Sequence, residues 1–244
     1  MKKVIIIPAR MQSKRFPGKV MYPIAGIPMI IRTWQQAMKV LDCSVYVASD
    51  DMDLLRACHE YGVKSYQLIK TGEHRNGTER CAEAARILGL ADDDHVLNLQ
   101  ADLPCIQPKL IERVFSWPYN DLVTAAVLCA GHPSVDPNMV KVIIDSKGAA
   151  VYFSRAAIPT QSNGWLNHIG IYKFTNRLLQ EFADQASCTL ERQEDLEQLR
   201  IIYYGIHKMY VILTNEDCIS INVPSDLEKL NIQWPDEQVI GHVI

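Results

Sequence analysis

The sequence predicts an α/β fold in which a mostly parallel central sheet carries helices on both faces. Short apolar runs alternate with stretches of helical apolar spacing through the first half of the chain, which indicates strands joined by crossover helices. Polar clusters follow several of these runs, and ligands of such sheets bind outside the carboxyl ends of the strands. The second half is richer in expected strands, which indicates a smaller mixed lobe continuous with the same sheet.

The first half provides the parallel part of the expected sheet. Its apolar, β-branched runs predict strands over Lys3–Ile7, Ser44–Ala48, Val63–Gln67 and His95–Leu99. The intervening segments have helical spacing and helix stop signals, and they predict helices over Met29–Val40, Asp53–Tyr61 and Glu79–Leu88.

The second half is expected to add further strands and a second group of helices. The strands are predicted over Leu122–Cys129, Val140–Ile144, Ala149–Phe153, His168–Phe174, Tyr210–Leu213 and Ser220–Val223. The acidic stretch Leu190–Arg200 predicts one helix, and Ser225 and Asp226 are expected to open a last helix.

Composition and charge limit the classes to which the protein can belong. With 244 residues, 48% of them hydrophobic, the chain is long enough for one large domain with a sizeable core. Its 25 Lys and Arg against 28 Asp and Glu give a formal net charge of −3, which provides no global basic field. Neither nucleic acid nor a membrane is therefore an expected partner, although a local basic cluster could bind a small polyanion.

The cysteines and the N-terminal run both indicate the cytoplasm. The seven cysteines are scattered without a CxxC pair or a metal-ligand spacing, which is typical of free thiols in a reducing compartment. The first apolar run ends at Pro8, too early for a signal peptide, and no run approaches the roughly 18 residues of a membrane span. We therefore expect a cytoplasmic protein.

The loop from Pro8 to Lys19 is the most informative segment of the sequence. A Pro-Gly pair near its end restricts and bends the backbone. Arginine can bind phosphate oxygens through two parallel hydrogen bonds, and lysine supplies a compact charge. Four such cations follow the first expected strand, namely Arg10, Lys14, Arg15 and Lys19. The loop is therefore a candidate binding site for a nucleoside triphosphate.

This loop carries neither of two common nucleotide-binding signatures. It lacks the GxxxxGKS/T pattern of P-loop proteins and the GxGxxG pattern of dinucleotide-binding proteins. A basic loop alone is readily explained as a solvated surface segment. Its position after the first strand and its Pro-Gly-Lys ending favour a functional role.

The same loop is similar to the N-terminal signature of sugar nucleotidyltransferases. His74–Arg80 and Asn98–Pro104 resemble the SGTER and NxQGDxP segments of one branch, the 3-deoxy-manno-octulosonate cytidylyltransferases or CMP-Kdo synthetases. Further similar segments follow in family order, namely Pro137–Val142, Tyr152–Pro159, His168–Tyr172 and Leu196–Arg200. Because these motifs span nearly the whole chain, the sequence resembles this family along its length.

The resemblance implies a Rossmann-like nucleotidyltransferase fold in a single domain, residues 1–244. A nucleotide-binding half would occupy about residues 1–120, and sugar-binding and dimerisation elements about residues 121–220. The implied reaction transfers CMP from CTP to a 3-deoxy-2-ulosonic acid such as Kdo, uses Mg²⁺ and releases pyrophosphate. The implied partners are CTP and an acidic sugar, in a homodimer that serves lipopolysaccharide synthesis.

The resemblance also implies roles for individual residues. The catalytic residues would be Arg10, Lys19 and Asp102, and the metal ligands Asp102 and Asn222. The nucleotide would be bound by Arg10, Arg15, Lys19, Asn76, Gly77, Thr78, Arg80 and Gln100. The sugar pocket would be lined by Gln100, Arg155, His168, Tyr172, Glu197 and Gln198.

Several of these assignments have a plain structural alternative. A histidine at a strand start is more often structural than catalytic, so we expect His168 to hydrogen-bond the sugar and not to act as a general base. Glu197 and Gln198 lie in an acidic stretch that could be a solvated helix face, and Tyr172 could belong to the core. Asp102 could cap a helix or turn, although carboxylate oxygens are the ligands that Mg²⁺ prefers.

The sequence departs from the family pattern at three places. Asn222 stands where the family has a second metal-binding Asp, and the nearby Asp226 is expected to cap the last helix. The stretch Thr160–Asn167 is shorter than the family loop near the sugar, and Ala101 replaces a glycine. These departures leave the natural sugar open.

Other functions therefore stay open at this point. The acceptor could be another acidic sugar, such as 8-amino-Kdo or a nonulosonate. The protein could instead be a nucleotidyltransferase of another polysaccharide or spore-coat pathway that prefers UTP or GTP. A catalytically impaired CTP-binding homologue is the third alternative, and Asn222 motivates it.

Overall fold

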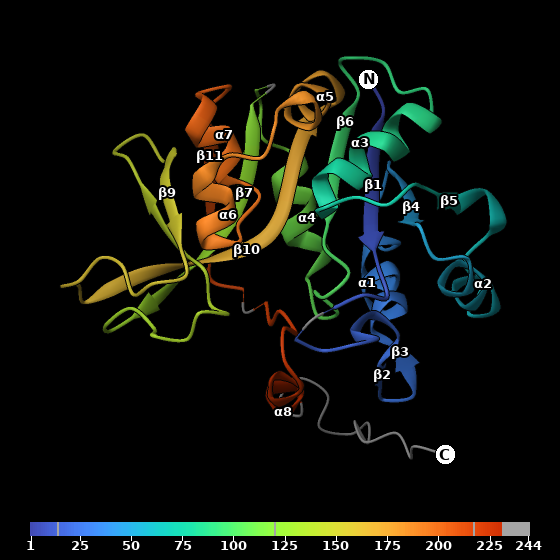
Figure 1. The fold of residues 1–244 in the computed structure, drawn as a ribbon, viewed down its shortest axis with the longest axis horizontal. Helices are drawn as coiled ribbons and strands as arrows, with labels where there is room; N and C mark the ends of the chain where they lie inside the picture. Colours follow the sequence, from blue (N-terminus) through green and yellow to red (C-terminus); the bar gives the residue numbers. More distant parts are fainter. Residues whose placement is uncertain (14, 120, 217, 231–244) are drawn as a thin grey trace.

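The computed structural model describes residues 1–13, 15–119, 121–216 and 218–230. These residues form a nine-stranded mixed sheet with helices on both faces (Figure 1). The strand order along its main path is β11-β7-β10-β6-β1-β4-β5, and β8 and β9 branch from β10. The predicted α/β class with a mostly parallel sheet is therefore confirmed. Lys14 of the basic loop lies outside the described residues.

The parallel part of the sheet is built around β1 (Lys3–Ala9). It lies between β4 (Ser44–Ser49) and β6 (His95–Leu99), and the short edge strand β5 (Leu68–Lys70) pairs with β4. The β-branched run of β1 is buried on both faces, as expected for a central parallel strand. The carboxyl ends of β1 and β6 therefore lie side by side, and the segments that follow them are neighbours.

The other part of the sheet is organised by the long strand β10 (Gly164–Thr175). It pairs antiparallel with β6 on one side and with β7 (Leu122–Ala130) on the other. Strand β11 (Met209–Thr214) lies parallel to β7. The first residues of β10 also pair with β8 (Lys141–Ile144), which forms a hairpin with β9 (Ala150–Ser154). This projecting part, at the left of Figure 1, corresponds to the expected smaller mixed lobe.

The sheet separates two apolar cores, and helices cover each of them. One core contains apolar residues of α1 (Met29–Ala37), α2 (Met52–Glu60) and α4 (Pro108–Phe115). The opposite core contains residues of α3 (Gly77–Ile87), α5 (Asn176–Asp184), α6 (Thr189–Glu194) and α7 (Leu199–Tyr204). Within the described ranges, every helix is too short or too polar to cross a lipid bilayer.

Short elements complete the described chain. A 3₁₀ turn, η1 (Lys19–Met21), follows the basic loop and leads into a small hairpin of β2 (Pro23–Ile24) and β3 (Ile27–Pro28). Near the end, η3 (Pro224–Asp226) runs into the one-turn helix α8 (Leu227–Leu230).

Three predicted elements differ from the structure. The strand expected over Val63–Gln67 is wrong, because Gln67 closes a 3₁₀ turn, η2 (Ser65–Gln67), by accepting a hydrogen bond from the Lys64 N–H, and the strand follows it. The helix expected over Leu190–Arg200 is split into α6 and α7 at Asp195, which has a φ of 52°. The strand expected over Ser220–Val223 forms no ladder in the described chain.

The loop expected over Thr160–Asn167 is also shorter than predicted. Strand β10 begins at Gly164 instead of His168, because residues 164–167 pair with the end of β7. Only the segment between β9 and Gly164 is left to connect the two strands.

Candidate active site

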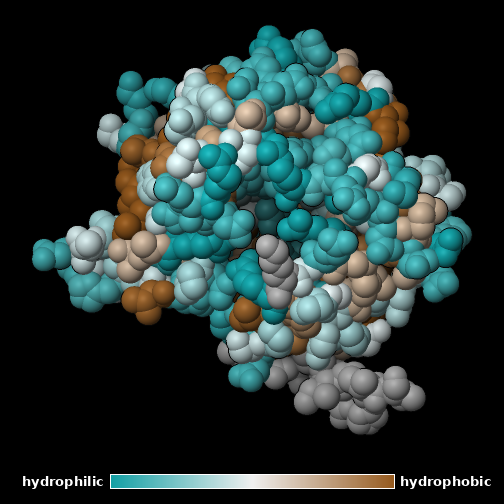
Figure 2. Space-filling view, in the orientation of Figure 1, coloured by the Kyte–Doolittle hydropathy of each residue, from teal (hydrophilic) through white to brown (hydrophobic). Residues whose placement is uncertain are grey.

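The centre of the candidate site is an ion pair between the basic loop and the end of β6. Lys19 Nζ lies 2.7 Å from Asp102 Oδ2, and the two side chains are 12% and 13% exposed. Lys19 follows β1 and Asp102 follows β6, so the parallel pairing of these strands brings the two segments together. Viewed from the side shown in Figure 1, the molecular surface is hollowed near its middle, and hydrophilic residues border the hollow (Figure 2).

Asp102 is held rigidly and keeps one oxygen atom unused. Its backbone carbonyl accepts a hydrogen bond from Ile221 N at 3.0 Å, and the preceding carbonyl accepts one from Thr33 Oγ1 at 3.0 Å. Asp102 Oδ1 is shielded from solvent and has no hydrogen-bond partner among the described residues. Because a buried unpaired carboxylate oxygen is costly, this atom is suited to a ligand such as a divalent cation.

The second expected metal ligand, Asn222, lies beside the same loop. Its Oδ1 accepts a hydrogen bond from Arg15 Nη2 at 3.3 Å, and Arg15 Nη1 also donates to Asn138 Oδ1. In the described part of the chain, no three His, Cys, Asp or Glu side chains form a metal-binding group. A cation at Asp102 would therefore need oxygen atoms from Asn222, water or a bound polyphosphate.

Asp226 is engaged in a turn and does not replace the missing carboxylate. Its Oδ2 accepts hydrogen bonds from the backbone N–H groups of Asn222 and Val223, at 2.8 and 3.0 Å. Its Oδ1 accepts one from Lys229 at 2.6 Å. Burial opposes ionisation, but these hydrogen bonds prevail and lower the pKa of the Asp226 carboxyl. The capping role expected for Asp226 is thus seen in its contacts with the backbone before α8.

Helix α3 begins beside the ends of β1 and β6. Its N-cap residue, Asn76, accepts a hydrogen bond from Glu79 N through Oδ1 at 2.8 Å. Gly77 allows close packing on β1, because a Cβ at this position would lie 3.1 Å from Pro8 Cγ. Thr78 Oγ1 accepts a hydrogen bond from the buried Asn98 of β6 at 3.0 Å. These contacts place the expected nucleotide-binding segment next to the basic loop.

Glu197 does not lie on a solvated helix face. Its Oε2 accepts a hydrogen bond from Thr78 N at 3.1 Å, and its Oε1 is shielded from solvent without a partner. Burial raises the pKa of the Glu197 carboxyl to about 7, although the hydrogen bond from Thr78 opposes the shift. The alternative of a solvated face is therefore wrong for this residue. Gln198 beside it is also buried, at 3% exposed.

His168 and Tyr172 lie close together on β10, with ring centroids 5.4 Å apart. His168 Nε2 is 2.8 Å from Thr124 Oγ1, and burial lowers the pKa of its imidazole to about 3. This imidazole is neutral at physiological pH and is a weak proton acceptor. Burial raises the pKa of the Tyr172 phenol, and the negative charges of Glu197 and Asp102 raise it further. Tyr172 is thus within electrostatic reach of both carboxylates.

Gln100 follows β6, and its side chain packs against β10. Its side chain lies against the backbone of Gly170, where a Cβ would be 3.1 Å from Gln100 Cδ. Gly170 lies between His168 and Tyr172 along the strand. Gln100 therefore lies between the two expected halves of the site, as its predicted contact with both substrates requires.

Three other expected site residues are engaged with the protein itself. Arg80 is buried, with Nη1 2.9 Å from Asp50 Oδ1 and 2.7 Å from Thr71 Oγ1. Arg155 donates to the backbone carbonyls of Pro137, Glu194 and Asp195. Arg10 is exposed and donates to the carbonyl of Arg75 at 3.3 Å. Arg80 and Arg155 brace the walls of the site, whereas Arg10 can turn toward a ligand at little cost.

Four residues without a predicted role support the site. Asn98 and Asn138 contact Thr78 and Arg15, and both lie inside motifs that sequence comparison could have singled out. Glu194 accepts hydrogen bonds from Ser154 and from Arg155 N, and the fully buried Arg200 bridges two carboxylates. Most of these contacts join segments distant in sequence, so spacing within one segment gives no signal for Glu194 or Arg200.

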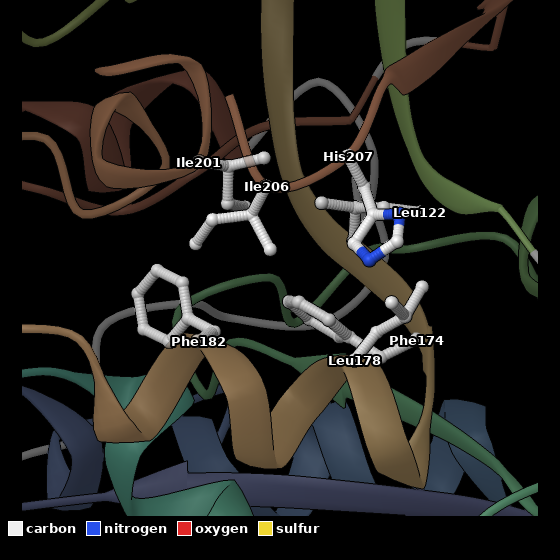
Figure 3. Close-up of a pocket in the computed structure, with 7 residues that line it drawn as sticks. All are labelled: Leu122, Phe174, Leu178, Phe182, Ile201, Ile206 and His207. Atoms are coloured by element: carbon white, nitrogen blue, oxygen red, sulfur yellow. The ribbon is translucent and has the colours of Figure 1, made fainter. Parts of the chain in front are cut away.

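A small apolar pocket lies elsewhere in the molecule. Its side chains converge from β7, β10, α5, α7 and the segment after α7 (Figure 3). Its lining consists of Leu122, Phe174, Leu178, Phe182, Ile201, Ile206 and His207. None of the predicted site residues is among them, and an apolar lining of this kind cannot neutralise a triphosphate.

A cationic loop and a carboxylate at adjacent strand ends of a Rossmann-like sheet define an α/β nucleotidyltransferase. The chain belongs to the cytidylyltransferase family, whose family model matches residues 4–213. This membership confirms the predicted resemblance and the enzyme class.

Individual relatives match almost the whole chain. The protein is 40% identical over 241 residues to the 3-deoxy-manno-octulosonate cytidylyltransferase of a Nitratiruptor species, covering 95% of this chain and 99% of the relative. It is 39% identical over 246 residues to a protein of that name from Helicobacter pylori, covering 96% and 98%. A solved structure of CMP:2-keto-3-deoxy-manno-octonic acid synthetase complexed with CTP matches with a TM-score of 0.83 at 31% identity, covering 97% and 100%.

Proposed function

We propose that the protein transfers CMP from CTP to the anomeric hydroxyl of a 3-deoxy-2-ulosonic acid such as Kdo, and releases pyrophosphate. The observation that carries this proposal is the Lys19–Asp102 contact, which joins a cationic loop to a carboxylate with one unused oxygen atom. The names of the relatives and the CTP in the matched structure support the choice of substrates. The product would be the activated sugar used for lipopolysaccharide synthesis.

On the nucleotide side, the loop cations would neutralise the triphosphate. Arg10 and Arg15 are exposed and Lys19 points to the end of β6, so all three can reach a ligand there. Asn76, Gly77, Thr78 and Gln100 would seat the rest of the nucleotide, while Arg80 would act by bracing the base of the site. Neutralising and orienting a polyphosphate is the main requirement of phosphoryl and nucleotidyl transfer.

The residues present fit a Mg²⁺ ion, which we propose as the cofactor. Asp102 Oδ1 is an unpaired hard oxygen, and Asn222 Oδ1 is a second oxygen near the same loop. When bound, Mg²⁺ would withdraw charge from the triphosphate and help to orient its α-phosphorus.

In the reaction, the anomeric oxygen forms a bond to the α-phosphorus, and the bond from the α-phosphorus to the bridging oxygen breaks. The leaving pyrophosphate takes that electron pair, and the hydroxyl proton passes to solvent. Lys19 and Arg10 would stabilise the negative charge that grows on the leaving group, so both act as electrostatic catalysts. A base at His168 is disfavoured, because the low pKa of its imidazole makes it a weak proton acceptor.

On the sugar side, β10 and the segment before α7 would line the pocket. Neutral His168 and Tyr172 offer hydrogen bonds, and Glu197 can accept a donor through Oε1. Gln100 would contact both substrates, Gln198 would complete the wall, and Arg155 would hold the turn that carries Glu197. This division assigns the nucleotide to the half before residue 120 and the sugar to residues 121–220, within one domain.

A cytoplasmic homodimer is part of the proposal. Cys43, Cys58, Cys81 and Cys188 are free thiols, which supports a reducing compartment. The projecting lobe exposes large apolar side chains, among them Leu128, Val135 and Val151, which supports a contact with a second copy.

Pyrophosphate release from CTP, Kdo and Mg²⁺ tests the proposed function. We expect turnover with CTP and little with UTP, GTP or ATP, matched by a CTP-specific rise in melting temperature. Failure with Kdo but turnover with 8-amino-Kdo or a nonulosonate would replace the sugar. CTP binding without turnover on any of these acids would favour the impaired homologue.

A further inference from the structure

Both side chains of the proposed metal site already contact cations of the basic loop. Lys19 Nζ occupies Asp102 Oδ2 at 2.7 Å, and Arg15 Nη2 occupies Asn222 Oδ1 at 3.3 Å. Two cations from one short loop thus contact two residues that are 120 positions apart in sequence. A bound cation would compete with Arg15 for Asn222 Oδ1, and the ammonium group of Lys19 beside Asp102 would repel it.

We propose that Lys19 and Arg15 keep the metal site closed until a polyphosphate withdraws them, so that the metal binds only together with the nucleotide. The proposal rests on the proposed function, because it concerns the same metal and triphosphate site. It assigns the two cations a second role beyond holding phosphate, which is to couple metal binding to polyphosphate binding.

The Lys19 contact opposes metal binding by charge, because it neutralises the carboxylate whose other oxygen atom, Oδ1, would bind the metal. An ammonium group 2.7 Å from Oδ2 cancels most of the attraction that Asp102 would exert on a second cation. The contact is 12% and 13% exposed, so solvent screens it only partly. A free divalent cation would therefore meet a neutralised carboxylate.

The backbone around Lys19 allows the side chain to leave without unfolding the loop. Lys19 N donates to the carbonyl of Phe16 at 3.1 Å, and its own carbonyl accepts from Tyr22 N at 3.0 Å. The main chain is fixed on both sides of the residue, whereas the flexible four-carbon stem can turn. Release of Asp102 therefore needs only a rotamer change.

The Arg15 contact is weaker, and Asn222 explains why. In the part of the chain that the structure describes, the exposed guanidinium donates to two neutral amides, those of Asn138 and Asn222. Phosphate oxygens bind a guanidinium more strongly than amides do, because the hydrogen bonds are charge-assisted. An aspartate at position 222 would hold Arg15 by an ion pair, so the asparagine here makes the second contact easier to open.

Manganese binding without nucleotide tests the proposal directly. Free Mn²⁺ is measured by its electron paramagnetic resonance signal while it is titrated with wild type, Lys19→Met and the control Lys39→Met. Lys39 is exposed and contacts only Gln36 by a side-chain hydrogen bond. We expect Lys19→Met to bind Mn²⁺ about tenfold more tightly than wild type, and the control to be unchanged. Adding Asp102→Asn to Lys19→Met should remove the gain.

Arg15→Gln provides a second variant that should not disturb folding, because Arg15 is exposed. We expect a smaller gain in Mn²⁺ affinity, about threefold, since its contacts are to neutral amides. In wild type, inorganic tripolyphosphate should create a protein-bound Mn²⁺ complex, seen by water-proton relaxation, and CMP should not. Circular dichroism and melting temperature verify that each variant is folded.

Equal Mn²⁺ affinity of folded wild type, Lys19→Met and Arg15→Gln would overturn the proposal. The proposal would also be overturned if wild type bound Mn²⁺ as readily with CMP as with tripolyphosphate. The proposed function is tested separately, by pyrophosphate release from CTP and Kdo in wild type. If wild type turns over but Lys19→Met gains no Mn²⁺ affinity, only the coupling of metal and polyphosphate binding is rejected. If the affinity rises but wild type does not turn over, only the proposed sugar transfer is rejected.

Discussion

Thr78 donates its backbone N–H to the carboxylate of Glu197 across 3.1 Å, and this contact joins the start of α3 to the segment before α7. The two residues are 119 positions apart, and the resemblance assigns one to the nucleotide and the other to the sugar. Because both proposed substrates border this contact, a change in the charge of Glu197 should affect both halves of the site.

Glu197 makes the folded state less stable as pH rises. The pKa of its carboxyl is raised from 4.5 to about 7, so the folded protein holds a proton that the unfolded chain releases between these values. The contribution of Glu197 is fully present below pH 4.5 and is lost as pH rises through 7, by up to about 3 kcal/mol. Glu197→Gln should remove this dependence. Urea unfolding of both proteins near pH 5 and pH 8 measures it, and a pH-independent difference would contradict the prediction.

Lys173 should make the folded state more stable as pH rises in the alkaline range. Its side chain is fully buried and donates to the carbonyl of Tyr119 at 2.7 Å, and burial lowers the pKa of its ammonium from 10.5 to about 8. The unfolded chain holds the proton between these values, so stability should rise as pH increases from about 8 to 10.5. Lys173→Met should lose this rise. Thermal unfolding of the two proteins near pH 8 and pH 10 compares them, and parallel curves would show that Lys173 titrates normally.

Gly170→Ala should impair catalysis more than stability. The new Cβ would lie 3.1 Å from Gln100 Cδ, so the glutamine side chain must shift away from its proposed position between the two substrates. We expect kcat/KM for the ulosonic acid to fall about tenfold, which corresponds to loss of one well-placed hydrogen bond. Gly164→Ala on the same strand is the matched control, because its Cβ would meet no atom closer than 3.4 Å. Equal losses in both variants would show that Gln100 is not the cause.

Arg200→Met should destabilise the fold strongly. The guanidinium is fully buried, at 2.9 Å from Glu79 Oε1 and 2.6 Å from Glu191 Oε1, and it packs 4.3 Å from the ring centroid of Phe182. Its removal leaves the buried Glu191 without this cation and Glu79 paired with the more exposed Arg75, at a cost of about 3–5 kcal/mol. The exposed pair formed by Arg56 is the control, and Arg56→Met should change stability by less than about 1 kcal/mol. Urea unfolding measures both, and similar values would refute the structural role of Arg200.

Asn222→Asp should distinguish a working enzyme from an impaired homologue. At saturating CTP, a carboxylate at this position adds charge to the metal site, so the Mg²⁺ concentration for half-maximal rate should fall about tenfold. If wild type is already active, kcat should change little. Activity that appears only in the variant would instead identify the natural protein as a CTP-binding homologue with impaired catalysis.

The sheet and the main cores could be predicted because their signals are local. The β-branched run of β1 and the strand β6 lie where the pattern placed them, within two residues. Helices α4 and α5 were not predicted, although Pro108 at the start of α4 and the Thr175 cap of α5 are helix signals. Both helices are eight or nine residues long, so few residues carry their apolar spacing.

The errors in the second half arise from long-range contacts. Asp195 breaks the expected helix, while the carboxylate of Glu194 accepts hydrogen bonds from Ser154 at the end of β9 and from Arg155 after it. The segment after Ser220 uses Asp226 and Asp102 as its partners instead of a neighbouring strand. Neither event can be read from spacing, because Ser154, Arg155 and Asp102 lie far from these segments in sequence.

The residues of the site could be predicted from motifs, but the contacts that these residues make within the protein could not. Sequence comparison grouped Arg80 and Arg155 with ligand-binding residues, whereas the structure engages both with the protein. It also gave no role to Asn98 or Asn138, whose importance depends on contacts with Thr78 and Arg15.

The carboxylate of Glu197 has a consequence for how this protein binds anions. In many nucleotide-binding proteins the amino end of a helix receives a phosphate, through free N–H groups and the helix dipole. Here Glu197 and Asn76 already accept the N–H groups of Thr78 and Glu79. Anion binding is thereby transferred from fixed backbone dipoles to mobile arginine and lysine side chains, so CTP affinity should fall steeply with ionic strength.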